Sequence, residues 1–99
     1  MRRERRQSSR VEVNWPVIVQ HAEGAMEGET LNFSAISAFI RCPKPLRLNE
    51  IFDMTINAPN RRLSVNAEVV WSNIHGRDDA ITPRGMGVRF LNMASEDQE

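Results

Sequence analysis

Apolar and polar side chains alternate along several short stretches of this 99-residue chain. The longest of these stretches carries Leu63, Val65, Ala67, Val69 and Trp71 at every second position. Successive side chains of a β-strand point to opposite faces, so a period of two gives one apolar face and one polar face. A helix would instead need apolar residues three and four positions apart. The pattern therefore predicts a protein built from half-buried strands.

Residues that favour turns divide the chain into short strands. Glu23-Gly24 and the segment 58–60 interrupt the apolar pattern, and the stretch 73–83 is polar and loop-like. Pro16 lies inside the first strand, which indicates a strand edge or a bulge there. The expected strands cover residues 11–19, 27–33, 38–41, 52–56, 63–71 and 86–90. Many short strands favour an all-β fold, a closed antiparallel barrel or a sandwich, and only the segment from Ser95 onward suits a short C-terminal helix.

Composition suits a single domain with a modest core, because 40% of the residues are hydrophobic. The formal net charge is zero, yet five arginines lie within the first ten residues. A basic tip on a neutral body is typical of an arm that meets an anion, rather than of a surface that coats nucleic acid or membrane. We therefore expect a flexible arginine-rich arm over residues 1–10 and a single barrel domain over residues 11–99.

The same composition bears on location. No apolar run approaches the ~20 residues of a membrane-spanning helix, and no apolar segment of the signal-peptide kind follows the arginines. Cys42 is the only cysteine, which excludes an internal disulfide and suits a reducing compartment. We expect a cytoplasmic protein without a membrane span.

Two short polar motifs in the first half of the chain point to a ligand. Arg6 and Arg10 are four residues apart, and Asn32 and Ser34 lie two apart in a predicted strand. Guanidinium groups match phosphate oxygens and the O6/N7 edge of guanine, and their flat faces stack on bases. If the apolar neighbours of Asn32 face the core, Asn32 and Ser34 share the outer face as one polar platform. The two motifs together favour an anionic, guanine-bearing ligand on the outer wall of the barrel, closed over by the arm.

These residues resemble the signature of the PilZ domain, the bacterial receptor module for cyclic di-GMP. That family carries R-x-x-x-R on an N-terminal arm and [D/N]-x-S-x-x-G further along, on the barrel. Arg6 and Arg10 match the first motif, and Arg5 precedes it. Asn32 and Ser34 match the second motif.

The likeness covers nearly the whole chain, because the segments 67–71 and 85–90 resemble the last strands of the family. Ser37 stands where the family usually has glycine, so the second motif is partly degenerate. Trp15 and Trp71 share the parity of core valines and are expected in the core, although Trp71 ends its strand and can also flank a bound base. The resemblance implies that the ligand-binding residues are Arg5, Arg6, Arg10, Asn32, Ser34 and Ser37, with Trp71 as an additional candidate.

The resemblance also implies a function and a mechanism. It implies a PilZ-like barrel of about six strands, of the split-barrel type, that binds cyclic di-GMP in the bacterial cytoplasm and needs no cofactor. Binding would order the arm across Asn32 and Ser34 and so create a surface for a partner protein. An arginine directly before the first motif goes with a stacked pair of ligands in this family, so Arg5 implies two ligand molecules per chain. No DNA or RNA partner is expected.

Other residues do not suggest catalysis or metal binding. His21 and His75 have no cysteine or carboxylate at ligand spacing, and Cys42 precedes a proline without a basic neighbour. Close packing or a bulge explains Gly85 and Gly87 better than a phosphate loop does. Because no set of nucleophile, base and orienting group can be assembled, we do not expect an enzyme.

Two other functions stay open. One is a degenerate PilZ-like adaptor that binds a protein and no nucleotide, an option raised by Ser37. The other is a nucleic-acid binder with a basic arm, which a small barrel and terminal arginines favour. That second option is disfavoured because the body of the sequence lacks a basic face and a stripe of stacking aromatic residues.

Overall fold

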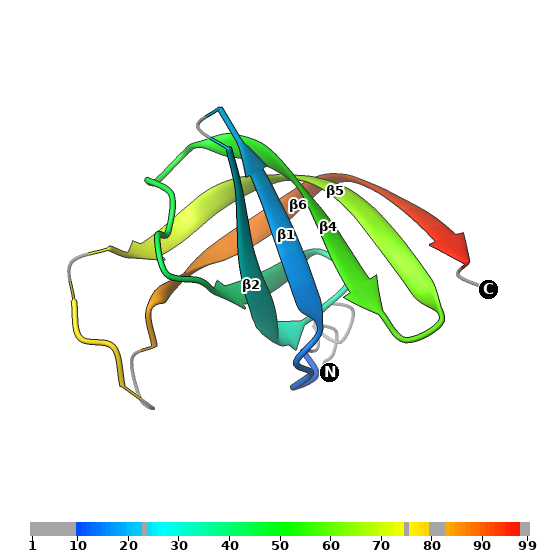
Figure 1. The fold of residues 1–99 in the computed structure, drawn as a ribbon, viewed down its shortest axis with the longest axis horizontal. Helices are drawn as coiled ribbons and strands as arrows, with labels where there is room; N and C mark the ends of the chain where they lie inside the picture. The colour runs from blue at the N-terminus through cyan, green and yellow to red at the C-terminus, as the bar shows by residue number, and fades with distance from the viewer. Residues whose placement is uncertain (1–9, 23, 75, 80–82, 98–99) are drawn as a thin grey trace, which may run out of the picture.

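Six antiparallel strands close into a barrel in the computed structural model of the protein, which describes residues 10–22, 24–74, 76–79 and 83–97. The strands are β1 Pro16–His21, β2 Gly24–Phe33, β3 Ser37–Arg41, β4 Ile51–Ala58, β5 Arg61–Asn73 and β6 Gly85–Asp97. Their order around the barrel is β1-β2-β3-β6-β5-β4, and pairing between β1 and β4 closes the ring (Figure 1). The predicted all-β fold and closed six-stranded antiparallel barrel are confirmed.

The inward face of each strand supplies the hydrophobic core, as the alternating pattern predicts. Trp15, Phe33 and Phe90 pack against this core, with ring centroids 5.2 Å apart for the first pair and 5.6 Å apart for the second. The buried core residues are Val17, Val19, Ala38, Ile40, Cys42, Leu46, Phe52, Met54, Ile56, Leu63, Val65, Ala67, Val69, Met86 and Val88.

Small and turn-forming residues lie where the backbone requires them. Gly24 has a φ of 128° and Asn60 a φ of 65°, so the predicted turns before β2 and before β5 are confirmed. An added Cβ at Gly85 would collide with the carbonyl oxygen of Ile40 and lie 2.7 Å from a ring carbon of Phe39. The predicted close packing at Gly85 is therefore also confirmed.

Three bulges interrupt the regular alternation of the strands, and one of them is Leu91, an extra residue in β6 between the partners of Asn66 and Ala67. Leu31 is an extra residue in β2, because Thr30 pairs with one residue of β3 and Asn32 with the next. Val70 is an extra residue in β5 in the same way, directly before Trp71. A bulge reverses the alternation for the residues that follow it. The expectation that Trp71 belongs to the core is wrong, since its side chain is 45% exposed on the outer wall.

Two predicted segments differ from the structure. The first strand begins at Pro16 rather than at Val11, which is 53% exposed and makes only an isolated bridge with Phe33. The predicted C-terminal helix is wrong, because Ser95 lies within β6 and pairs with Leu63 of β5. Pairing along the whole length of β5 overrides the weak capping signal at Ser95. Among the described residues, no helix is present that could span a membrane.

Candidate functional site

Thr30, a fully buried residue of β2, fixes the segment 10–15 along the end of that strand. Its Oγ1 donates a hydrogen bond to the carbonyl oxygen of Val13 (2.5 Å) and accepts one from the backbone N–H of Trp15 (2.9 Å). The side-chain amide of Asn14 donates to the carbonyl oxygen of Thr30 at 2.9 Å. A buried hydroxyl with both a donor and an acceptor partner holds such a segment firmly. The chain entering β1 is therefore anchored before the barrel begins.

Arg10 joins the two motifs at the start of this segment. Val11 and Phe33 exchange backbone hydrogen bonds of 2.8 and 2.9 Å, which hold Arg10 beside the end of β2. The Nη1 of Arg10 donates to Oδ1 of Asn32 (3.4 Å), and its Nη2 donates to Oγ of Ser37 (3.1 Å). Three residues that lie up to 27 positions apart in the sequence thus converge on the outer wall.

Ser34 lies beneath this group and not on its surface. Its side chain is 4% exposed, and its Oγ accepts hydrogen bonds from the backbone N–H groups of Ile36 (3.2 Å) and Ser37 (3.1 Å). The backbone N–H of Ser34 also donates to the carbonyl oxygen of Ser37 at 2.8 Å. The expected outer platform of Asn32 and Ser34 is therefore wrong for Ser34, which holds the turn between β2 and β3.

Ser37 fits its position without backbone strain. Within the described part of the chain, the non-glycine residues with positive φ are Asn49 and Asn60, so Ser37 does not adopt the conformation that favours glycine. The neighbouring Ala38 is buried, which directs the side chain of Ser37 outward. A serine at this place consequently provides an acceptor for Arg10.

An aromatic row continues the outer wall from Asn32. Asn32 pairs with Phe39 of β3, and Phe39 pairs with Gly87 of β6, which in turn pairs with Trp71 of β5. The rings of Phe39 and Trp71 approach to 5.4 Å between centroids. Because Gly87 has no side chain, these two rings meet across it and form one apolar surface next to the polar group.

A charged row runs parallel to the aromatic one. Ser37 pairs with Arg89 of β6, and Arg89 pairs with Glu68 of β5. The Nε of Arg89 donates to Oε1 of Glu68 at 3.0 Å, and its Nη2 lies 2.7 Å from the same oxygen. This pair, whose members are 21 residues apart, was not predicted from the sequence. Glu68 and Arg89 occupy outward-facing positions of two predicted strands, and these positions could have indicated the pair.

The structure bears on some predicted site residues and not on others. Arg10 and Ser37 are in contact, and Trp71 lies on the same wall two strands away. Arg5 and Arg6 lie outside the described residues, as does the rest of the predicted arm before Arg10. Their part in ligand binding stays a prediction.

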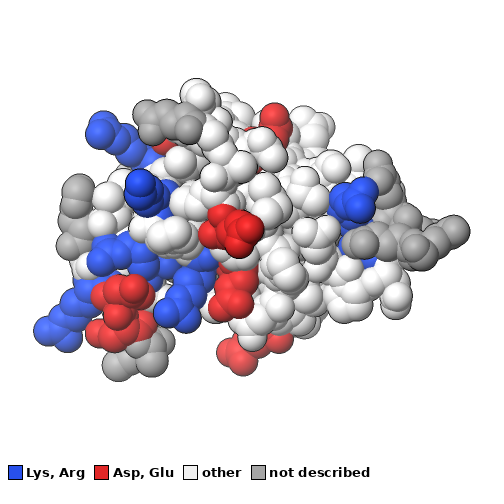
Figure 2. All heavy atoms as spheres, in the orientation of Figure 1, with Lys and Arg blue, Asp and Glu red and all other residues white. Residues whose placement is uncertain are grey.

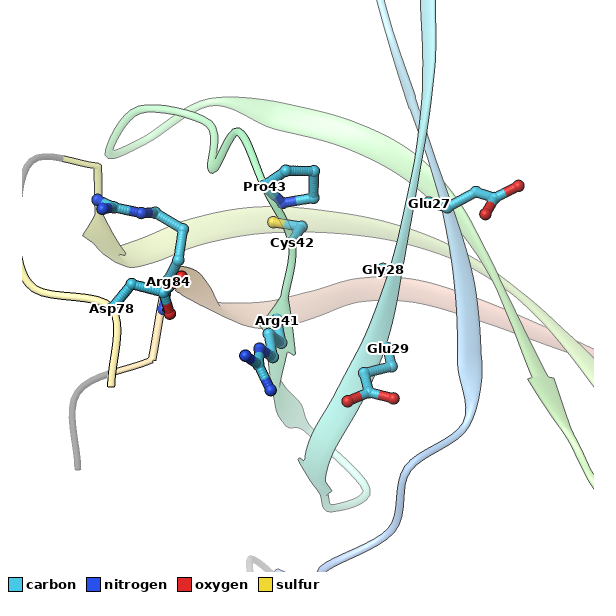
Figure 3. Close-up of a pocket in the computed structure, with 8 residues that line it drawn as sticks. All are labelled: Glu27, Gly28, Glu29, Arg41, Cys42, Pro43, Asp78 and Arg84. Atoms are coloured by element: carbon cyan, nitrogen blue, oxygen red, sulfur yellow. The ribbon is translucent and has the colours of Figure 1, made fainter. Parts of the chain in front are cut away.

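A shallow hollow lies between β2, β3 and the connection from β5 to β6, and hydrogen bonds of its residues hold that connection in place. The Nη1 of Arg84 donates to the carbonyl oxygen of Ile74 (2.6 Å), and its backbone N–H donates to Oδ1 of Asp78 (2.8 Å). Cys42 is buried there, and burial raises the pKa of its thiol to about 11, as expected for a packed cysteine. Charges of both signs meet in this hollow, which Figure 3 shows with its lining residues Glu27, Gly28, Glu29, Arg41, Cys42, Pro43, Asp78 and Arg84.

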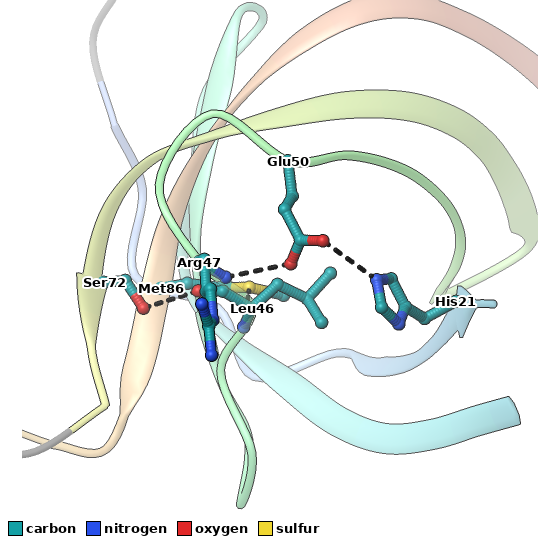
Figure 4. A network of polar contacts seen from close by, with 6 residues as sticks. All are labelled: His21, Leu46, Arg47, Glu50, Ser72 and Met86. Carbon is teal, nitrogen blue, oxygen red and sulfur yellow. Dashed lines mark hydrogen bonds and ion pairs between the residues drawn. The ribbon is translucent and has the colours of Figure 1, made fainter. Parts of the chain in front are cut away.

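A polar network lies where β1 ends and β4 begins (Figure 4). Glu50 accepts a hydrogen bond from the backbone N–H of Arg47 (3.1 Å), and its other oxygen lies 3.2 Å from Nε2 of His21. The hydrogen bond from Arg47 first, and that from His21 second, hold the pKa of Glu50 below its ordinary value. Within the described residues, no three His, Cys, Asp or Glu side chains gather as metal ligands would, and His75 lies outside that part of the chain.

Comparisons with known proteins agree with this geometry. The family model of the PilZ domain matches residues 4–99, a range that includes both motifs and all six strands. A search of the curated proteins found no significant match. Since the family match covers nearly the whole chain and the barrel is closed and antiparallel as the resemblance implies, the chain belongs to the PilZ domain family, whose members are generally receptors for cyclic di-GMP.

Proposed function

We propose that this protein is a receptor for cyclic di-GMP that binds its ligand on the outer wall of the barrel. The observation that carries the proposal is the contact of one guanidinium group, that of Arg10, with both Asn32 and Ser37. This contact brings the arginine motif and the Asn/Ser motif together. PilZ domains are a binding family rather than a catalytic one, which agrees with the proposal.

Each group on the wall has chemistry suited to a cyclic dinucleotide. Arg10 can donate two hydrogen bonds to a phosphate or to the O6/N7 edge of guanine. Asn32 offers an amide for the polar edge of the base, and Trp71 offers a half-exposed ring on which a base can stack. Ser34 supports the site by fixing the turn that carries Ser37. Arg5 and Arg6, as the preceding cationic residues, would close over the ligand from outside.

Signalling follows from the same arrangement. A ligand held between the arginines and the wall would fix the arm against the barrel and present a new surface to a partner protein. The proposed ligand and the single cysteine support a location in the bacterial cytoplasm.

Nucleic acid is a poorer candidate as the ligand of this protein. Figure 2 shows that, on the face in view and among the described residues, Lys and Arg side chains form separate groups, the larger of which is interleaved with Asp and Glu. A protein that tracks a phosphate backbone needs a continuous basic groove with stacking side chains along it.

Isothermal titration calorimetry with cyclic di-GMP tests the proposal. We expect saturable binding to the wild-type chain, with guanosine monophosphate as a control ligand that binds far more weakly because it lacks the second guanine and phosphate. The molar ratio at saturation also tests the implied role of Arg5, since two ligands per chain should fall to one in Arg5→Leu. The absence of any heat or competition signal up to millimolar ligand would overturn the receptor proposal.

A protein-binding adaptor without nucleotide is the second candidate. It is favoured by Ser37 at the usual glycine position and by the buried hydroxyl of Ser34, which already has partners within its own turn. The same titration separates the two functions, because the adaptor would bind a partner protein equally well with and without cyclic di-GMP.

A further inference from the structure

Ser37 lies between two arginines on the outer wall. Arg10 reaches it from the segment before β1, with its Nη2 3.1 Å from Oγ. Arg89 lies directly opposite Ser37 in the register of β3 and β6, and both side chains point outward because Ala38 and Val88 are buried. Directly opposed residues on antiparallel strands have Cβ atoms roughly 5 Å apart. An anion above Ser37 would therefore lie within reach of both guanidinium groups.

Arg89 is turned away from Ser37 in this structure. β5 and β3 lie on opposite sides of β6, and two donors of Arg89 engage a single oxygen of Glu68 on β5. The side chain of Arg89 is 58% exposed and that of Glu68 is 21% exposed. Arg89 thus stands between a carboxylate on one side and the group of Arg10 and Ser37 on the other.

The charges explain this orientation. Two guanidinium groups that converge on a neutral serine repel each other unless an anion lies between them. Glu68 supplies that anion to Arg89 from the far side, whereas a phosphate above Ser37 would supply it to both arginines at once. An exposed ion pair is weak, so the exchange of one anion for the other costs little.

We propose that Arg89 is a further ligand-binding residue and that Glu68 is an internal competitor which the ligand displaces, an inference that rests on the proposed binding of cyclic di-GMP. In the structure, Arg89 is bonded to Glu68. With ligand, the guanidinium of Arg89 turns toward Ser37 and donates to the same phosphate or guanine edge as Arg10. Glu68 therefore sets the affinity of the site without touching the ligand.

Calorimetric titration of four chains tests this exchange: wild type, Arg89→Gln, Glu68→Gln and the double variant. We expect Arg89→Gln to weaken binding about 10-fold or more, because it loses a charge-assisted contact. Glu68→Gln should tighten binding about 2- to 5-fold, the change in affinity that corresponds to the free energy of an exposed ion pair. In the Arg89→Gln background, Glu68→Gln should have no further effect.

Two matched controls remove the same charges elsewhere. Arg47→Gln and Glu27→Gln change exposed residues near the other end of β2 and should leave the affinity unchanged. Thermal unfolding of each variant verifies that the barrel is intact, and Arg89→Lys provides a second test that keeps the charge and loses the fork.

The outcomes separate this inference from the proposed function. Binding that is lost in Arg10→Ala but unchanged in Arg89→Gln would overturn the role of Arg89 and leave the receptor standing. Equal tightening by Glu68→Gln with and without Arg89 would show a general field effect and overturn the competition. No binding by any of the chains would overturn the receptor and this inference together.

Discussion

Residues that match one motif have different structural roles in this protein. Asn32 presents its amide to Arg10 on the outer wall, whereas Ser34, two positions later, is 4% exposed and bonded within its own turn. Parity alone would put both on one face, but the strand ends at Phe33 and the chain turns at Ser34. A match of residue letters therefore identifies the segment, and hydrogen bonding decides which side chain is available to a ligand.

Ser34→Ala tests the structural role of the buried hydroxyl. The substitution leaves the backbone N–H groups of Ile36 and Ser37 without their acceptor, so the free energy of unfolding should fall by ~1–2 kcal/mol. Urea denaturation followed by tryptophan fluorescence measures the change. Ser64→Ala, at an exposed position of β5, is the matched control and should change the stability little. Similar losses in both variants would contradict the special role of Ser34.

Arg10→Ala tests the junction of the two motifs. Because the guanidinium makes charge-assisted hydrogen bonds in the proposed complex, binding of cyclic di-GMP should weaken by ~2–3 kcal/mol. The melting temperature should hardly move, since Arg10 is exposed and the anchoring contacts come from the backbone of Val11 and from Thr30. Arg47→Ala removes an exposed arginine elsewhere and is the control. Equal affinity of Arg10→Ala and wild type would remove this residue from the binding mechanism.

At the scale of the strand, the alternating pattern predicted the inward faces of β4 and β5 well, because burial of one face selects for a period of two. It could not predict the extra residues Leu31, Val70 and Leu91, since a bulge depends on how two strands pair and leaves no mark in either one alone. Trp71 was misassigned for that reason. The helix expected from Ser95 failed similarly, because β5 offers pairing that a local capping signal does not reveal.

A pair of glycines in β6 tests how closely β3 and β6 approach. Gly85→Ala should destabilise the barrel by ~1–3 kcal/mol, because the new methyl group would meet the backbone oxygen of Ile40 and the ring of Phe39. Gly87→Ala is the matched control, since the nearest atom to its methyl group is Cβ of Trp71 at 3.5 Å, an ordinary contact. Thermal unfolding of both variants compares them. Equal destabilisation of the two variants would contradict a specific collision at Gly85.

At the scale of the whole molecule, hydrogen bonds tie down irregular segments at the two ends of β2. Thr30 anchors the segment before β1 near one end, and the contacts of Glu50 with Arg47 and His21 hold the connection between β3 and β4 near the other. The sequence shows neither, since each joins residues that are far apart along the chain. Pairing of β1 with β2 brings Thr30 beside the segment before β1, whereas closure of the ring through β1 and β4, which the resemblance implied, brings His21 beside Glu50.

The contacts of Glu50 should make stability depend on pH. The pKa of Glu50 is lowered from its ordinary value of 4.5, so its stabilising effect is present above that value and is lost as the pH falls through the lower pKa of the folded state. Wild type should therefore lose stability relative to Glu50→Gln as the pH falls from 4.5 through the lower pKa of Glu50 in the folded state. Urea denaturation at a series of pH values measures the difference. Parallel pH profiles for the two proteins would contradict this linkage.

The outer wall is assembled from segments that are made at different times during synthesis. Arg10, Asn32 and Ser37 belong to the first part of the chain, whereas Gly87 and Arg89 belong to its last strand. A nascent chain therefore carries only half of the wall until β6 has emerged and docked between β3 and β5. A molecule that spans the wall would connect the segment before β1 with the last strand of the barrel, so it would slow hydrogen exchange across the entire barrel and not only around its own contacts.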